Sequence, residues 1–81
     1  MRLPRDLSSD ELIRRLQRFG YKQTRQTGSH ARLTYTGDKG EHHITIPRHS
    51  PLRVGTLNSI LNNIAAHLQI DKDALLRQLV S

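Results

Sequence analysis

The spacing of the apolar residues changes at Gly20, and this change constrains the fold of the 81-residue chain more than any other feature. Before Gly20, apolar side chains recur every three or four residues, which is typical of a helix that buries one face. After it, apolar and polar side chains alternate, which is typical of strands that bury one face. Helical spacing returns after Pro51. The chain is therefore predicted to place a small sheet between helices.

The first predicted helix follows Ser8, because Ser8-Ser9-Asp10-Glu11 has the pattern of a capping box. In this motif the serine hydroxyl accepts a hydrogen bond from the glutamate amide, and the glutamate side chain reaches back to the amide of the cap. Gly20 is the expected residue after the last turn. The helix is predicted to bury Leu12, Ile13, Leu16 and Phe19 and to expose Arg14, Arg15 and Arg18.

Three antiparallel strands are predicted at residues 21–26, 30–36 and 41–46, joined by residues 27–29 and 37–40. The face toward the helices carries Tyr21, Ala31, Leu33, Tyr35, Ile44 and Ile46. The opposite face carries Lys22, Thr24, His30, Arg32 and His43. Counting from the two connections, the predicted neighbours are Thr34 with His43, Arg32 with Thr45 and Thr24, and His30 with Gln26 and Pro47.

Two further helices are predicted after a loop at residues 47–51. The start of the first is left open between Ser50-Pro51 and Gly55-Thr56, since either pair suits a cap and a first turn. Its apolar stripe consists of Leu57, Ile60, Leu61, Ile64 and Leu68, and Asp71 is the predicted N-cap of a short last helix. Because these stripes can cover only one side of a three-stranded sheet, an α+β fold of order α-β-β-β-α-α with an open sheet face is predicted.

Length and composition limit the class of protein. A chain of 81 residues supports one hydrophobic core, so a single domain spanning residues 1–81 is expected. The chain has no cysteine, which excludes disulfides and thiolate metal sites. No apolar run approaches the roughly 20 residues of a membrane span, and no segment resembles a signal peptide. We therefore expect a soluble cytoplasmic protein without membrane contact.

The positive charge is concentrated in one part of the chain. Residues 1–53 contain eleven Lys or Arg and five Asp or Glu, whereas residues 54–81 contain two of each kind. Such an excess is compatible with a merely solvated basic surface, or with a nucleic acid or acidic protein partner. Residues 54–71 contain no Lys or Arg. Any RNA is therefore expected on the open sheet face or at Arg14, Arg15 and Arg18.

Two segments together resemble a known family. They are Gly28-Ser29-His30, which leads into the second strand, and HITIPRHSPLRVGTLNSILNNI at residues 43–64. Their order and spacing are similar to those of the HicA-type, or YcfA-like, messenger-RNA interferase toxins. The resemblance covers about residues 8–70, and residues 71–81 resemble a C-terminal helix of some longer members.

The resemblance implies a fold like that of a double-stranded-RNA-binding domain, with the short extra helix at its end. It also implies an endoribonuclease that cleaves messenger RNA without a metal or other cofactor and that is inhibited by a cognate HicB-type antitoxin. The catalytic position implied by the family pattern is His30. If the antitoxin is acidic, it is expected to cover the basic sheet face and to bury His30.

Histidine suits this chemistry, because its ordinary pKa near 6.5 lets it accept a proton from a ribose 2′-hydroxyl at neutral pH. The 2′-oxygen then attacks the adjacent phosphorus, a route that DNA cannot follow, and direct binding of DNA is not expected. The candidates for RNA binding are Gly28, Ser29, Arg32, Lys22, Arg25 and His49. Arginine and lysine would stabilise charge on the phosphate, and a glycine allows close approach of the RNA backbone.

The sequence is also compatible with other interpretations. His30 taken alone could be an ordinary surface histidine, and the chain could be a non-catalytic RNA-binding module or a protein that only binds an acidic partner. A metal site is disfavoured because His42 and His43 are consecutive in a strand and face opposite ways. His67 is expected to face solvent.

Overall fold

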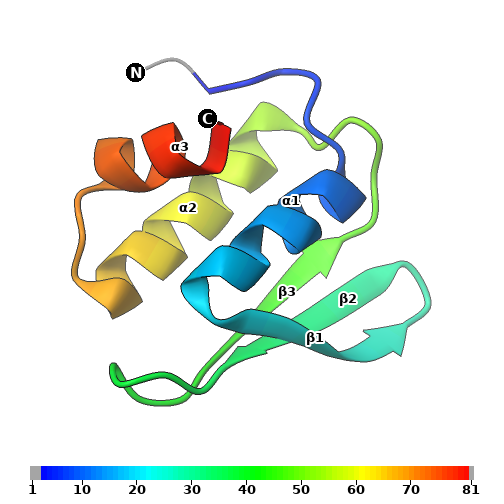
Figure 1. The fold of residues 1–81 in the computed structure, drawn as a ribbon. Helices are drawn as coiled ribbons and strands as arrows, with labels where there is room; N and C mark the ends of the chain where they lie inside the picture. Colours follow the sequence, from blue (N-terminus) through cyan, green and yellow to red (C-terminus); the bar gives the residue numbers. More distant parts are fainter. Residues whose placement is uncertain (1–2, 81) are drawn as a thin grey trace.

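The computed structural model describes residues 3–80 and has the predicted order of helices and strands (Figure 1). The elements are α1 (Ser9–Leu16), the 3-10 turn η1 (Gln17–Phe19), β1 (Tyr21–Thr27), β2 (His30–Tyr35), β3 (His42–Pro47), α2 (Val54–Leu68) and α3 (Lys72–Val80). The predicted α+β class and the extra C-terminal helix are confirmed. Ser81, the last residue of the predicted extension, lies outside the described residues. No helix within residues 3–80 has the length and hydrophobicity that crossing a membrane requires.

Helix α1 begins as predicted, but only half of the capping box forms. The Ser8 hydroxyl accepts a hydrogen bond from the Glu11 amide at 3.1 Å. The Glu11 carboxylate does not reach back to the cap; it pairs instead with Arg14 and with Arg15, the latter at 3.0 Å. The last turn tightens into η1, and Gly20 ends it with a φ of +94°. The helix thus stops where the apolar spacing changes.

The three strands form one antiparallel sheet of order β1-β2-β3. Burial alternates along β2 and β3, so one face meets the helices and the other is open to solvent, as predicted (Figure 1). Tyr21 and Tyr35 are buried against each other, with ring centroids 5.2 Å apart. The apolar face of the sheet therefore forms one core with the stripes of α1, α2 and α3.

The register of β1 against β2 differs from the predicted one beyond Gln23. The turn contains two residues rather than three, because Thr27 pairs with His30. With this turn at one end and the buried pair of Tyr21 and Tyr35 at the other, β1 has one residue more than β2, which it accommodates as a bulge between Gln23 and Arg25. As a result Arg32 is opposite Arg25 rather than Thr24, and His30 is opposite Thr27 rather than Gln26.

The other sheet pairs and the apolar stripe of α2 agree with the prediction, whereas the start of α2 differs from it. Thr34 pairs with His43, Arg32 with Thr45 and His30 with Pro47. Helix α2 starts at Val54 after Arg53, whose side chain makes no capping hydrogen bond, so neither proposed cap is used. Its predicted stripe is buried, as are Leu75, Leu76 and Leu79 of α3. Asp71 caps α3 through its carboxylate, which accepts from the Ala74 amide at 3.2 Å.

Candidate functional site

The turn between β1 and β2 presents His30 at the first position of β2. Gly28 has a φ of +56°, as the first central residue of a two-residue hairpin turn of type II′ requires. A Cβ built at Gly28 has no atom within 4 Å, so the glycine leaves open space above the turn. The His30 side chain is exposed on the open face of the sheet, and its ring makes no hydrogen bond to any of residues 3–80. Both ring nitrogens are therefore free to meet a ligand.

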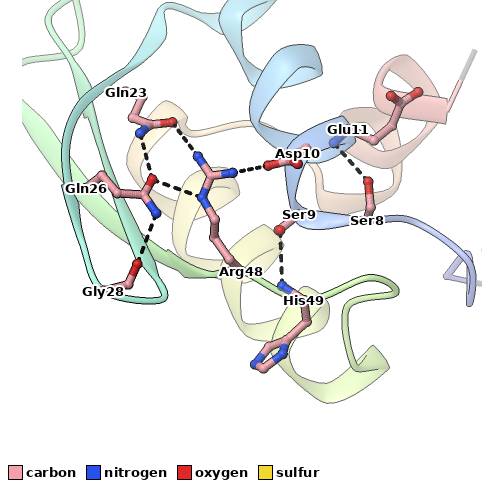
Figure 2. A network of polar contacts seen from close by, with 9 residues as sticks. All are labelled: Ser8, Ser9, Asp10, Glu11, Gln23, Gln26, Gly28, Arg48 and His49. Atoms are coloured by element: carbon pink, nitrogen blue, oxygen red, sulfur yellow. Dashed lines mark hydrogen bonds and ion pairs between the residues drawn. The ribbon is translucent and has the colours of Figure 1, made fainter.

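Arg48 holds this turn from the end of β3 (Figure 2). Its main-chain N–H donates to the Ser29 carbonyl at 2.6 Å. Its guanidinium Nε donates to Oε1 of Gln26 at 2.9 Å, and the Gln26 amide donates in turn to the Gly28 carbonyl at 3.1 Å. Sequence reasoning did not single out Arg48, although pairing Pro47 with His30 places its neighbour Arg48 beside Ser29.

The same arginine joins the hairpin to the start of α1. Its guanidinium forms an ion pair with Asp10 and a hydrogen bond to Gln23 at 3.3 Å (Figure 2). His49, the residue after Arg48, is bound to Ser9 of α1. The Ser9 amide donates to the His49 carbonyl at 2.9 Å, and the Ser9 hydroxyl accepts from the His49 amide at 3.1 Å. The turn that carries His30 is therefore tied to the helical layer at two successive residues.

His49 does not lie on the open sheet face with the other predicted RNA-binding residues. It lines a hollow at the start of α1 together with Ser8, Ser9 and Asp10, and in Figure 2 its ring points away from the Arg48 contacts. The structure thus brings Gly28, Ser29, Lys22, Arg25 and Arg32 to the same side as His30. His49 is separated from them.

The arginines of the two candidate RNA surfaces differ in their partners. On α1, Arg14 and Arg15 pair with Glu11. Arg15 also donates to the Leu79 carbonyl at 2.6 Å, and Arg18 donates to the Gln78 carbonyl at 3.2 Å, so both satisfy the end of α3. On the sheet, Arg25 and Arg32 are exposed, and their guanidinium groups have no hydrogen-bond or ion-pair partner among residues 3–80. Of these two surfaces, the open sheet face is therefore the one with unengaged guanidinium groups.

His42 and His43 face opposite sides of β3, as predicted. His43 lies on the open face between Thr34 Oγ1, 2.9 Å from its Nδ1, and Glu41 Oε2, 3.3 Å from its Nε2. His42 lies on the helix side, where its ring stacks on that of His67 with centroids 4.2 Å apart. The prediction that His67 faces solvent is wrong, because this ring is half-buried and its Nε2 also lies 2.9 Å from the Gly40 carbonyl oxygen.

His42 has a hydrogen-bond partner at each ring nitrogen. Nδ1 lies 2.6 Å from the Tyr21 hydroxyl, and Nε2 lies 3.2 Å from Asn63 Oδ1. These partners suit a neutral ring that donates from Nε2 and accepts at Nδ1. Burial raises the pKa of Tyr21 to about 12, so the phenol keeps the proton that it donates. Burial also lowers the pKa of His42, and the adjacent His67 lowers it further. These two histidines therefore have a structural role.

The part of the chain that the structure describes contains no candidate metal site. No group of three His, Cys, Asp or Glu side chains in residues 3–80 lies close enough together to hold an ion. The open face presents imidazole, guanidinium, ammonium and hydroxyl groups, together with the Glu41 carboxylate that pairs with His43.

The fold and these side chains define a class of protein: a small basic α+β domain that presents an unengaged histidine beside free arginines, groups suited to binding and cleaving a phosphodiester. Residues 9–65 match the family model described as the HicA toxin of bacterial toxin-antitoxin, and the chain belongs to this family. It is therefore the toxin of a toxin–antitoxin pair, and toxins of this family are generally ribonucleases with a cognate antitoxin. Comparison with curated proteins and with solved structures finds no match.

Proposed function

We propose that this toxin is a metal-independent endoribonuclease of messenger RNA in which His30 is the general base. The observation that carries the proposal is the placement of His30, whose ring is exposed and unengaged on the same sheet face as Arg25 and Arg32. Three of the other four histidines have ring nitrogens occupied by protein partners, and the fourth, His49, lies at the start of α1.

In the proposed reaction, His30 removes the proton of a ribose 2′-hydroxyl. The 2′-oxygen forms a bond to the neighbouring phosphorus while the bond to the 5′-oxygen breaks, and the leaving oxygen takes a proton from solvent, which reaches this open face. The products are a 2′,3′-cyclic phosphate and a 5′-hydroxyl. Arg32 stands two residues from His30 along β2, about 7 Å away, and supplies positive charge near the reacting phosphate. Lys22 and Arg25 add to the basic surface that receives the RNA.

Gly28 and Ser29 give the RNA backbone access to His30. The positive φ of Gly28 and the empty space above it suit close approach of a ribose–phosphate chain. The hydrogen bonds from Arg48 and Gln26 fix both carbonyls of the turn, so His30 is held in place before RNA binds. His49 has no assigned part in this step, because it lies away from the sheet face.

The experiment is an incubation of purified protein with single-stranded RNA in EDTA, comparing the native chain, His30→Ala and Asn62→Ala. Asn62 is an exposed residue of α2 whose side chain has no polar contact to other described residues, so its variant controls for effects of substitution in general. We expect cleavage by the native chain and by Asn62→Ala, with a rate about 10² to 10⁴ times lower for His30→Ala. The products should carry 2′,3′-cyclic phosphates, and DNA of the same sequence should stay intact.

Each other outcome contradicts the proposal in its own way. Loss of native cleavage in EDTA would indicate metal-dependent chemistry. RNA binding without cleavage would indicate a non-catalytic module of the same fold. Unchanged cleavage by His30→Ala would move the general base to another residue.

We further propose that a HicB-type antitoxin inhibits the toxin by covering the open sheet face, with acidic side chains placed against Arg25 and Arg32. Because the same face receives RNA, bound antitoxin should abolish both RNA binding and access to His30. Hydrogen–deuterium exchange of the complex should show protection at Gly28, Ser29 and His30. A complex that still binds RNA, with this turn unprotected, would contradict the proposed mode of inhibition.

A further inference from the structure

Two arginines face each other directly across the open sheet face. The bulge in β1 makes Arg25 the cross-strand partner of Arg32. Like charges at directly opposite positions destabilise a sheet. Neither guanidinium has a carboxylate or other polar partner within the described part of the chain. The pair therefore carries an electrostatic cost that a bound anion would relieve, and such a local conflict is expected at functional sites.

The arginine pair borders a hollow that contains fixed hydroxyl groups. Besides Arg25 and Arg32, the hollow is lined by Thr24, Thr34 and His43, and its volume is about 280 Å³. The Thr24 and Thr34 hydroxyl oxygens are 2.9 Å apart, and the Thr34 hydroxyl lies 2.9 Å from Nδ1 of His43. These hydroxyls are thus held in place at the edge of the two guanidinium groups.

The His43 ring is held on both sides. Its Nε2 lies 3.3 Å from Glu41 Oε2, and its Nδ1 meets Thr34. A ring with both nitrogens engaged by the protein has no free position for taking a proton from substrate, in contrast to His30. His43 therefore lines the hollow and orients the Thr34 hydroxyl.

We propose that this hollow is a phosphate subsite, which binds a backbone phosphodiester of the RNA close to the phosphodiester cleaved at His30. The proposal rests on the proposed function for the identity of the ligand as RNA. Arginine side chains suit this role because their planar donor groups match phosphate oxygens. Arg32 and His30 lie on one face of β2 about 7 Å apart, so one RNA strand, with its regularly spaced charges, can occupy both places.

The test measures RNA binding separately from cleavage. Arg25→Gln and Arg32→Gln are each introduced into His30→Ala, and binding of a fluorescein-labelled single-stranded RNA decamer is followed by anisotropy over a range of salt concentrations. Each substitution should weaken binding about tenfold at low salt and reduce the slope of log K against log salt by about 0.7, the value for one phosphate contact on a single strand. Arg77→Gln in α3 removes the same charge from an exposed position and should change neither quantity.

Thermal stability is a second measurement, and the same substitutions that weaken RNA binding should raise it. Without RNA, Arg25→Gln and Arg32→Gln should each raise the midpoint of thermal unfolding, because each removes a like-charge contact. A lower midpoint, an unchanged salt slope, or an effect equal to that of Arg77→Gln would overturn the subsite. Binding of an acidic peptide with no binding of RNA would also overturn it and would assign the pair to a protein partner.

The two proposals can fail separately. If the native chain does not cleave RNA while the arginine variants still weaken binding as described, the catalytic assignment falls and the subsite stands. If cleavage depends on His30 while the arginine variants bind RNA normally, the subsite falls and the catalytic assignment stands.

Discussion

His30 and His43 lie on the same sheet face but differ in what surrounds their rings. His43 is held between Glu41 and Thr34, whereas the ring of His30 has no polar partner within residues 3–80. Period-two alternation is enough to place both residues on the open face. It does not reveal which ring is free, because that depends on side chains of neighbouring strands.

Gly37 is a residue at which a single methyl group should change stability. A Cβ at Gly37 would lie 2.5 Å from Cζ of Tyr35, which is 5 % exposed and whose hydroxyl donates to Asp38 at 3.2 Å and accepts from the Lys39 amide. Gly37→Ala must therefore displace this buried ring. We expect it to lower the free energy of unfolding by about 2 kcal/mol, measured by urea denaturation.

The matched control is Gly55→Ala in the first turn of α2. A Cβ there meets no atom within 4 Å, and the substitution reduces the freedom of the unfolded chain. It should raise stability by about 0.5 kcal/mol. Equal effects of the two substitutions would show that Tyr35 does not pack against Gly37 as described.

At the scale of elements, the contact between β3 and α2 depends on a neutral histidine. Ring stacking of His42 on His67 and the hydrogen bond of His42 to Asn63 join these two elements, and the hydrogen bond of His42 to Tyr21 joins β3 to β1. Burial lowers the pKa of His42 in the folded protein below its ordinary value. At any pH between the lowered pKa and the ordinary pKa, the unfolded chain therefore binds more protons than the native one. This contribution to stability is complete above about pH 6.5 and is lost as the pH falls through the lowered pKa.

We therefore expect the free energy of unfolding to fall between pH 7.5 and pH 5, with a slope of at most about 1.4 kcal/mol per pH unit from this single proton. His42→Phe, which keeps a planar ring but does not titrate, should reduce the slope. His49→Gln removes a histidine whose ring has no polar partner among the described residues and should leave the slope unchanged. A slope that is unchanged in His42→Phe and reduced in His49→Gln would show that His42 is not the source of the pH dependence.

At the scale of the whole molecule, the hydrophobic core and the candidate site lie on opposite faces of the sheet. The helices cover the inner sheet face and form one core with it (Figure 1). The outer sheet face carries Arg25, Arg32 and His30, whose side chains have no polar partner within residues 3–80. The order of elements and the buried stripes were predictable from sequence, because each reflects local periodicity against a single core.

Three features were not predictable from sequence. The bulge beside Thr24 arises because the turn at Gly28 and the buried tyrosine pair together fix the length of β1. The stack of His42 on His67 joins residues from β3 and α2. The contacts of Arg48 reach Asp10, Gln23 and Gln26 from a distant part of the chain. Each depends on tertiary distances that local patterns do not contain.

Chemical rescue tests the central claim most directly. His30→Ala leaves a gap on an exposed surface, so free imidazole can reach the position of the missing ring and accept the 2′-hydroxyl proton in its place. Cleavage of RNA by His30→Ala in EDTA should therefore rise in proportion to added imidazole and yield the same cyclic phosphate ends as the native toxin. An inactive, folded and RNA-binding His30→Ala that imidazole does not restore would contradict the assignment of His30 as the base.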